Sequence, residues 1–425
     1  MSSITIFTPV HKLDWKVTEL YNSLCVQTDK NFTWLVLLNG DAEAKDSDLL
    51  ALLGLSDFPS WMNVMSHKTT GNIGALKSAC CRLVTTDIAV EWDYDDIATQ
   101  DAVEKIRGAF EDDAVKFVYS NCVEFQEKWD IRKPKCTIYG AQYGWKARPF
   151  RDGYTQLVAF KPSAHYMRRV EWAPNHVRAW RMDAYNKIGG YNTTIAVGDD
   201  HELICRFYIE YGDKGFRHLD ECIYLYRVHP DNTCSGANRN KEVQEQVDKN
   251  YCMHAEKMYM KWAKDHNLLC LDLGGRFNCP TGYESCDLRD ADHVFDLRGD
   301  WPFEDGSIGV LRAYHLLEHL PDTIDFFNKA YQKLAPGGFL LIEVPDFLGL
   351  GGVSDPTHIK FFNERSFGYF TNQNLAKFIQ PQYTGKFQVA RQAKYNWEDG
   401  VTVISCQLIA LKGWYDAEWC GERLM

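Results

Sequence analysis

Short apolar segments that are typical of strands alternate with amphipathic segments that are typical of helices, from the first residues of the chain onward. The strand-like segments cover residues 4–10, 32–40, 63–69, 87–93 and 115–120. Helical patterns occupy residues 14–27, 73–84 and 100–111 between them. This alternation indicates a parallel α/β sheet covered by helices, and ligands of such sheets bind beyond the carboxyl ends of the strands.

The chain is too long for one ordinary hydrophobic core. It has 425 residues, of which 45% are apolar and 14% aromatic, which is enough to fill two or three cores. Residues 237–266 lack Gly and Pro and carry apolar side chains at helical spacing, so we expect a helical connector there. A second α/β series follows, with strand-like segments at 268–276, 283–288, 293–297, 308–320, 339–346 and 401–412. We therefore expect one domain over residues 1–236 and another over residues 267–425.

Charge and cysteine usage narrow the functional classes. The formal net charge of -11 argues against a protein coated in positive potential, although it leaves room for a local basic patch. The 14 cysteines are scattered without any Cys-x-x-Cys, and no secretory signal precedes the first strand-like segment, so we expect reduced thiols in a cytoplasmic protein. No run of about 18 apolar residues occurs, so we expect no insertion into a membrane.

The sequence EWDYDD, residues 91–96, places four acidic side chains in six positions. On a strand, Asp93 and Asp95 would point to the same side, Tyr94 would point away and Asp96 would begin the turn. Two carboxylates about 4 Å apart repel by roughly 4 kcal/mol at an effective dielectric of 20, and a divalent cation turns this repulsion into attraction. The motif therefore favours a metal site, and the plainer alternative is an acidic turn that caps a helix starting near Thr99.

Further motifs surround this one in a fixed order. TPV (8–10), LLNGD (37–41) and GNIGALKSA (71–79) precede it, and WRMDAYNKIGGYN (180–192), VGDDHELICRF (197–207) and YRVHPDNTCSG (226–236) follow it. Together they resemble the nucleotide-sugar half of the family 2 glycosyltransferases, which have the GT-A fold. The resemblance implies transfer of a sugar from a nucleoside-diphosphate sugar to an acceptor hydroxyl, with inversion and with Mn²⁺ or Mg²⁺ as cofactor.

The resemblance also implies roles for particular residues. The metal would be held by Asp93 and Asp95, with His229 as a further candidate. The donor pocket would comprise Pro9, Asn39, Asn72, Gly74, Lys77 and Asp93. Asn39 stands where an aspartate is more common in the family, so the donor nucleotide stays open. Plainer alternatives remain for Lys77, a solvated helix lysine, and for His229, a hydrogen-bonded loop histidine.

An inverting displacement needs a base beside the acceptor hydroxyl. The resemblance favours Asp200 for this role, with Asp199 in reserve. We expect the neighbouring carboxylate of Asp199 to raise the proton affinity of Asp200. His201 is expected to be structural.

The second series resembles a class I S-adenosylmethionine methyltransferase, through its order of segments, its Leu-Glu-His helix (317–319) and its turn KLAPGGFL (333–340). The overall fold class expected is thus α/β, with two Rossmann-like domains. The resemblance implies a cofactor pocket formed by Asp272, Gly274, Gly275, Asp287 and Asp296.

The cofactor turn departs from the family pattern, because Arg276 stands where a second glycine of Gly-x-Gly belongs. We therefore expect a degenerate domain that supports the first domain or docks the acceptor. The alternative is a bifunctional enzyme that adds a sugar and methylates the product. A third, non-enzymatic alternative is a binding protein with two relic folds.

Residues 128–187 carry thirteen Lys or Arg against four Asp or Glu, interleaved with Tyr and Trp. Such a mixture suits stacking on sugars or bases while cations contact phosphates. The acceptor expected is an acidic glycan or DNA with a hydroxylated base, which base flipping would have to expose. The plainer alternative is a surface insertion whose arginines pair with the acidic second domain.

Overall fold

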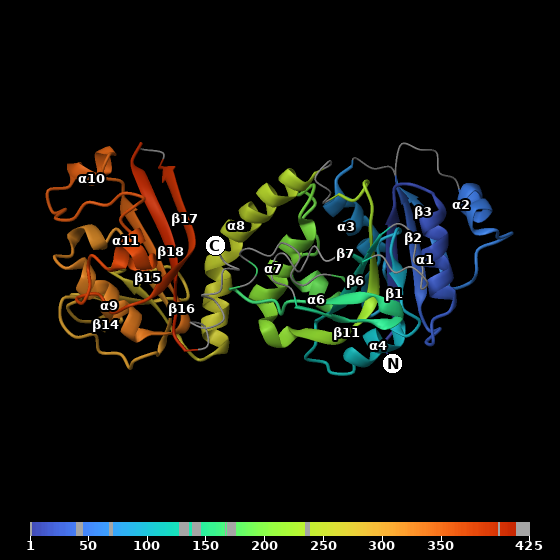
Figure 1. Cartoon of the computed structure of the whole chain (residues 1–425), viewed down its shortest axis with the longest axis horizontal. Coiled ribbons are helices and arrows are strands. Elements are labelled where there is room, and N and C mark those ends of the chain that lie inside the picture. Colours follow the sequence, from blue (N-terminus) through green and yellow to red (C-terminus); the bar gives the residue numbers. More distant parts are fainter. Residues whose placement is uncertain are drawn as a thin grey trace. The chain divides into compact units, whose positions relative to one another are not determined.

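The computed structural model describes residues 2–39, 46–67, 71–126, 136–137, 146–165, 167, 176–233, 239–397 and 400–413. The chain forms two compact units, Met1–Met258 and Tyr259–Met425 (Figure 1). Each unit is built around its own mixed sheet with helices packed on it. The predicted α/β fold is therefore confirmed for both halves of the chain.

The sheet of unit 1 runs in the order β3-β2-β1-β4-β10-β6-β11-β5. Its strands are β1 (Ile4–Val10), β2 (Thr33–Asn39), β3 (Met62–His67), β4 (Ile88–Glu91), β5 (Ile97–Ala98), β6 (Phe117–Gln126), β10 (Arg178–Arg181) and β11 (Phe216–Val228). Three short strands attach to its side: β7 (Cys136–Thr137), β8 (Lys146–Pro149) and β9 (Thr155–Val158). The first four strands are parallel, as predicted, but β10 enters between β4 and β6 and is antiparallel to both.

The helices of unit 1 follow the predicted alternation. They are α1 (Trp15–Cys25), α2 (Asp46–Leu53), α3 (Ile73–Leu83), α4 (Ala102–Ala109), α6 (Met182–Lys187), α7 (Asp199–Tyr211) and α8 (Asn240–Asp265). Two short 3₁₀ helices, η1 (Arg151–Gly153) and η2 (Asp213–Gly215), complete the unit. The expected helical connector is α8, and the boundary between the two units falls inside it.

One predicted strand ends earlier than expected. Strand β4 stops at Glu91, and residues 92–96 form a turn in which the N–H of Asp96 donates to the carbonyl oxygen of Asp93 at 3.3 Å. The alternation of sides along a strand therefore does not place Asp93 and Asp95. Their positions depend on the turn and on its contacts with β11.

The sheet of unit 2 runs in the order β14-β13-β12-β15-β16-β18-β17. Its strands are β12 (Leu269–Leu273), β13 (Glu284–Asp287), β14 (His293–Val294), β15 (Ile308–Tyr314), β16 (Leu334–Pro345), β17 (Phe387–Asn396) and β18 (Thr402–Ala410). The helical elements are η3 (Leu317–His319), α9 (Thr323–Lys333), α10 (Leu350–Ser354), α11 (Gly368–Thr371) and α12 (Gln373–Ala376). All neighbouring strands are parallel except β18, which is antiparallel to both of its neighbours. The strand order reverses between β12 and β15, where open α/β sheets bind their ligands.

Both units have well-filled cores. In unit 2, the buried side chains of β15, β16 and β18 pack against aromatic residues of α9 and α11, and Phe327 stacks on Phe370 with ring centroids 3.7 Å apart. The cysteines among the described residues carry free thiols. None of the described helices has the length and apolarity needed to cross a bilayer.

Candidate functional site

The acidic turn after β4 is anchored by its last residue. Asp96 is buried, and its carboxylate accepts from the backbone N–H of Arg227 at 2.6 Å and from the hydroxyl of Tyr224 at 2.7 Å. The Arg227 side chain donates to the carbonyl oxygen of Asp95 at 2.6 Å and pairs with Glu19 at 2.5 Å. Strand β11 thereby fixes the turn, so that Asp96 is structural while Asp93 and Asp95 remain partly exposed.

The three predicted metal ligands divide into two neighbouring groups. Nε2 of His229 lies 2.8 Å from Oδ2 of Asp95, so the two residues are directly paired. Asp93 belongs to another group, in which ligand atoms of Glu91, Asp93 and His176 all lie within 4.8 Å of one another. Nε2 of His176 is 3.6 Å from Oδ2 of Asp93.

The carboxylate of Asp93 lies close to other acidic side chains. Burial, together with the charges of Glu91 and Asp95, raises its pKa to about 7 against the opposing effect of Lys77. A carboxylate in such surroundings is stabilised by a cation more than by a proton at neutral pH. Asp93 and Asp95, with His229 alongside, therefore fit a divalent cation in chemistry.

A second carboxylate pair opens helix α7. Gly198 precedes it with a left-handed φ of 67°, and Asp199 and Asp200 are the first two residues of the helix. Nζ of Lys77 lies 3.3 Å from Oδ2 of Asp199, and Nη2 of Arg178 lies 2.6 Å from Oδ2 of Asp200. Each acid of the pair thus has its own cation.

Glu91 connects the two acidic regions. It is fully buried at the end of β4, where Lys77 and Arg178 approach Oε1 at 2.9 and 3.0 Å and the hydroxyl of Tyr191 donates to Oε2. Burial would raise the pKa of Glu91, but the two cations outweigh burial and hold this pKa well below its usual range. The same two cations reach Asp199 and Asp200, so one buried network positions β4 and the start of α7.

The electrostatics of the acid pair differ from the expectation. Burial and the charges of Asp200 and Glu91 raise the pKa of Asp199 to about 6, although Lys77 opposes them. For Asp200, burial is outweighed by Arg178 and Lys77, and its pKa is lowered. The expectation that Asp199 would raise the proton affinity of Asp200 was therefore wrong, because the closest charge to Asp200 is a guanidinium. The side chain of Asp200 is nevertheless 24% exposed and that of Asp199 only 4%, so an acceptor can reach Asp200 more easily.

The predicted donor residues lie at the carboxyl ends of β1 and β2 and on α3. Pro9 is paired in register with Leu37, and Asn39 ends β2 with a buried Oδ1 that has no hydrogen-bond partner among the described residues. Asn72 caps α3 by accepting from the N–H of Ala75 at 2.9 Å. The amide oxygen of Asn39 could therefore accept a hydrogen bond from a ligand, whereas that of Asn72 already accepts one from the helix.

Two residues of α3 hold the helix against the segment that leads to α7. A Cβ on Gly74 would lie 2.8 Å from the carbonyl oxygens of Asn192 and Ile195. Lys77 is buried by the same approach and faces carboxylates, so it is not the solvated lysine that was the alternative. His201 is fully buried and contacts the carbonyl oxygen of Met167 at 3.0 Å, as a structural histidine does.

Sequence analysis missed Glu91, His176, Arg178 and Tyr191 as parts of this site. Glu91 belongs to the acidic run but lay outside the DxD pattern. Arg178 is the first residue of β10 and His176 lies two residues before it, and no local motif marks either residue. His176 stacks on Tyr224 with ring centroids 4.7 Å apart, a contact between segments 48 residues apart that only the fold creates.

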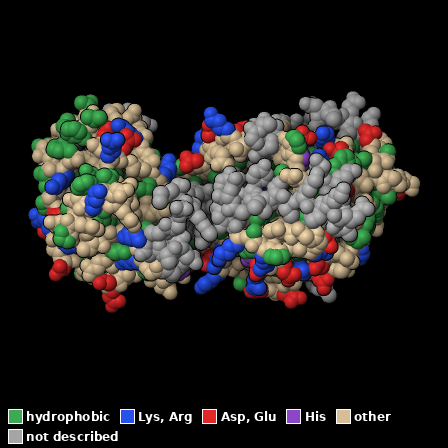
Figure 2. Space-filling model, in the orientation of Figure 1, with side chains coloured by type: hydrophobic (Ala, Val, Ile, Leu, Met, Phe, Trp, Pro, Cys, Tyr) green, Lys and Arg blue, Asp and Glu red, His purple; other side chains and the backbone are tan. Residues whose placement is uncertain are grey.

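Much of the basic segment, residues 127–135, 138–145, 166 and 168–175, lies outside the described residues. Its described cations pair with acids of unit 1: Arg148 with Asp220, Lys161 with Asp213, Arg181 with Asp113 and Lys187 with Glu210. Figure 2 shows Lys or Arg and Asp or Glu side chains intermingled on the visible face. These four cations already have acidic partners within unit 1.

The cofactor turn of unit 2 is closed by ion pairs. Gly274 has a left-handed φ of 77°, and a Cβ on Gly275 would lie 2.3 Å from Oδ2 of Asp272. Oδ1 of Asp272 pairs with Arg312 at 2.8 Å, and Arg276 pairs with Asp290.

The last two acids of the expected cofactor pocket, Asp287 and Asp296, differ in their contacts. Asp287 ends β13 and accepts from the adjacent N–H of Leu288 at 2.6 Å. Asp296 is held by Arg298 at 2.6 Å, which lowers the pKa of Asp296 to about 2. A pocket of about 540 Å³ in unit 2 lies away from these residues, and its lining includes Asp305, Asn328 and Lys412. With Arg276 in the turn and Asp296 paired with Arg298, these residues depart from the set expected to hold S-adenosylmethionine.

Comparison with known proteins gives one family and a set of solved structures. A family model described as a methyltransferase domain matches residues 233–374. A search of curated proteins found no significant match. Among solved structures, TarS from S. aureus is 11% identical with a TM-score of 0.41; the match covers 62% of this chain and 43% of that one, so this chain spans less than half of TarS.

Two further solved structures are similar over the same share of this chain. Residues 1–349 of TarS in complex with UDP-GlcNAc match with a TM-score of 0.43 at 11% identity, over 62% of this chain and 72% of that one. The mannosyltransferase PcManGT from Pyrobaculum calidifontis, in complex with GDP-Man and Mn²⁺, matches with a TM-score of 0.36 at 13% identity, over 62% and 74%. TM-scores this low carry no argument about function. The family match over residues 233–374, by contrast, confirms the methyltransferase-like domain that the sequence predicted in the C-terminal part of the chain.

Proposed function

We propose that unit 1 is a metal-dependent, inverting glycosyltransferase that moves a sugar from a nucleoside-diphosphate sugar to an acceptor hydroxyl. The observation that carries this proposal is the buried network in which Lys77 and Arg178 join Glu91 to Asp199 and Asp200. It places an acidic turn and an acid pair at the carboxyl end of the same sheet, where α/β folds bind ligands. In a single displacement at a sugar carbon, a cation stabilises the departing diphosphate and a separate base takes the proton of the acceptor hydroxyl.

In this mechanism Asp93 and Asp95, with His229 alongside, hold Mn²⁺ or Mg²⁺, which when bound accepts charge that develops on the departing diphosphate. Asn39 offers its unpartnered amide oxygen to the donor nucleobase. Asp200 accepts the proton of the acceptor hydroxyl, and Arg178 orients the Asp200 carboxylate through its 2.6 Å contact. Asp199 stays in reserve as the base because its side chain is almost fully buried.

The direct test is incubation of the full chain with a panel of nucleotide sugars and Mn²⁺. Release of nucleoside diphosphate, abolished by EDTA, is the expected result and identifies the donor. Absence of release with every donor, in the presence of candidate acceptors, would support a binding protein instead.

The family match over residues 233–374 favours a second candidate, a bifunctional enzyme that also transfers methyl groups. The contacts of Arg276 and Arg298 oppose it, and we propose that unit 2 supports unit 1 or docks the acceptor. Acceptors proposed are an acidic glycan or DNA with a hydroxylated base. Duplex binding that weakens steeply with salt would favour DNA, and salt-independent or absent binding would exclude it.

A further inference from the structure

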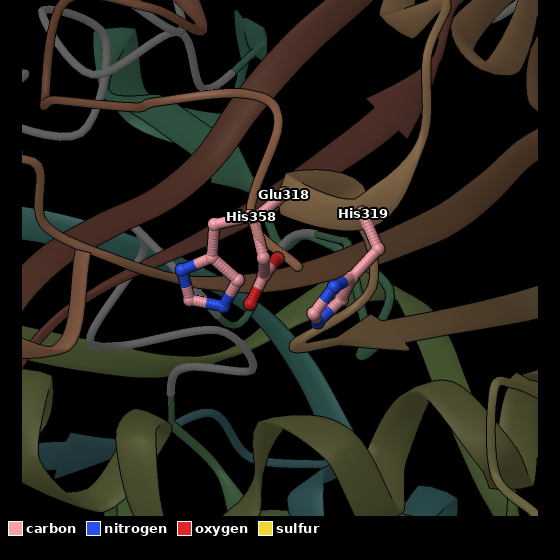
Figure 3. Close-up of side chains that lie close together, drawn as sticks. All are labelled: Glu318, His319 and His358. Carbon is pink, nitrogen blue, oxygen red and sulfur yellow. The ribbon is translucent and has the colours of Figure 1, made fainter. Parts of the chain in front are cut away.

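A cluster of three ligand-type side chains lies beyond the carboxyl end of β15 in unit 2 (Figure 3). Glu318 and His319 belong to η3, and His358 comes from the segment between α10 and α11. One ligand atom from each residue lies within 4.8 Å of the other two, and the Glu318 carboxylate faces the space between the two imidazole rings. None of the three belongs to the cofactor pocket that the sequence predicted.

Glu318 is the unusual member, because its residue is 1% exposed and, among the described residues, neither carboxylate oxygen accepts a hydrogen bond of good geometry. Its nearest cationic contact is Nδ1 of His315 at 3.5 Å from Oε1, which is longer than a normal N–H···O bond. His315 also pairs with Glu343, at 3.2 Å, so its charge is shared. A buried carboxylate without a close partner is costly, and metal coordination is one of the few ways to compensate it.

In both histidines Nδ1 contacts an oxygen, and Nε2 of His358 lies 3.8 Å from Oδ2 of Asp355. Nδ1 of His358 lies 3.1 Å from the carbonyl oxygen of Gly352, which only accepts, so Nδ1 carries the proton. Nδ1 of His319 lies 3.1 Å from the hydroxyl oxygen of Thr357 and 3.4 Å from its carbonyl oxygen. The Thr357 hydroxyl already donates to Asp355 at 2.6 Å, so it accepts from His319.

In both neutral imidazoles, therefore, Nδ1–H is bound to an acceptor and the lone pair is on Nε2. This is the arrangement in which outer partners fix the tautomer and the ring orientation of histidine ligands. Two such nitrogens and one buried carboxylate are a typical donor set for a first-row transition metal.

We propose that Glu318, His319 and His358 bind a divalent transition metal ion of the Zn²⁺ class, through one carboxylate oxygen and the two Nε2 atoms. Three protein ligands leave at least one coordination position for water or for a substrate group. The ion would tie η3 to the segment around His358, which is already docked there by the N–H groups of Ile359 and Lys360 on the carbonyl oxygen of Glu318. It would also place a Lewis acid at the ligand-binding edge of the sheet of unit 2.

The test must separate this site from the proposed metal site of unit 1, so it uses the full chain with Asp93→Asn and Asp95→Asn. After metal is removed by chelation and dialysis, we expect this variant to bind one Zn²⁺ per chain and to melt at a higher temperature with the ion. Co²⁺ in place of Zn²⁺ should give the visible absorption of a low-symmetry site with nitrogen ligands. Loss of all tight binding in the Asp93/Asp95 variant would overturn the proposal.

Glu318→Gln and His358→Gln should each weaken Zn²⁺ binding at least about 10-fold in that background, since even outer partners of metal ligands are worth 10–100-fold. His293→Gln is the matched control, because His293 pairs with Glu284 at 2.6 Å in the same unit and should not change binding. Glu318→Gln keeps the shape of the side chain and leaves His315 paired with Glu343, so the metal-free variant should still fold and melt cooperatively. Unchanged Zn²⁺ affinity in both variants would refute the site.

Discussion

At the scale of single residues, the proposed active site depends on which carboxylates have a cation and which do not. Glu91 has two cations and Asp200 has one at 2.6 Å, whereas Asp93 faces other carboxylates and a histidine. The pKa of Asp200 is lowered and that of Asp93 is raised to about 7, whereas burial raises the pKa of Asp199 to about 6 although Lys77 lies 3.3 Å away. A metal ion would supply what Asp93 lacks.

Replacing Asp93 or Asp95 by Asn should reduce sugar transfer by at least about 100-fold, comparable to the loss of one preorganised electrostatic contact in other enzymes. The fold should persist in both variants.

Because the folded-state pKa of Asp93 is raised above its ordinary value, the metal-free protein loses stability from this group as the pH rises from about 4 to about 7. Melting curves in EDTA should show that loss in the parent chain and a smaller one in Asp93→Asn. Undiminished transfer by both variants, or in excess EDTA, would contradict the metal site.

The identity of the base can be read from a pH profile. A base acts when deprotonated, so the rate falls as the pH drops below its pKa. If Asp200 is the base, kcat/KM should stay level down to about pH 4, because the Asp200 pKa lies below the ordinary value for Asp. Asp199 as base would give a fall near pH 6 instead.

Asp200→Asn should lower kcat by about 10²–10⁴-fold and leave donor binding intact. Asp199→Asn is the comparison, and an inactive Asp199→Asn beside an active Asp200→Asn would assign the base to the reserve residue.

At the scale of elements, the position of α7 depends on how closely α3 approaches the segment before it. A Cβ on Gly74 would lie 2.8 Å from two backbone oxygens of residues 192–195 and 3.2 Å from Cβ of Asp199. Neither backbone oxygen can move without shifting the start of α7. The glycine is thus part of the active-site geometry although it has no side chain.

Gly74→Ala should therefore destabilise the protein by about 1–3 kcal/mol, the usual range for overpacking, and should also reduce transfer by displacing the acid pair. Gly108→Ala in α4 is the matched control, because no atom lies within 4 Å of its added Cβ and alanine favours a helix interior by up to about 1 kcal/mol. Urea unfolding of both variants measures the difference. Equal stabilities would show that the segment relaxes freely.

Elements with a strong local pattern could be predicted from the sequence, and those held by tertiary contacts could not. Strands β1 and β2 are rich in apolar and β-branched residues, and both lie where the pattern indicated. Strand β10 reads Arg-Ala-Trp-Arg and has no such pattern; it is a strand because β4 and β6 flank it and supply its hydrogen bonds. In unit 2, the half-exposed strand β17 was missed for a similar reason.

In the candidate site, too, residues in local motifs could be predicted and their tertiary contacts could not. Asp93, Asp95, Asp199 and Asp200 stand in short acidic motifs and could be named, but their protonation could not. Arg178 reverses the expected pKa shift of Asp200, and it reaches Asp200 from a strand that was not predicted. Pairings of this kind depend on the three-dimensional neighbourhood and have no local sequence signal.

At the scale of the whole molecule, two domains of the same fold class serve different purposes under our proposal. Unit 1 holds the transfer chemistry, while unit 2 has a methyltransferase family match but a cofactor turn occupied by ion pairs. Calorimetry with micromolar S-adenosylmethionine should therefore detect no binding to the full chain.

The variant Arg276→Gly alone should gain little, because Asp296 remains paired with Arg298; adding Arg298→Ala should be needed for any binding. Micromolar binding by the unmodified chain would favour the bifunctional enzyme.

Helix α8 has a practical consequence for handling this protein. The boundary between the units falls between Met258 and Tyr259, both buried, inside a continuous helix that runs from Asn240 to Asp265. Proteases cleave exposed, locally unfolded segments rather than ordered, buried helices. Limited digestion should thus nick other parts of the chain before it separates the two units, and a gene cut at residue 258 would leave each fragment with a severed helix. Production of either unit alone calls for keeping the whole of α8.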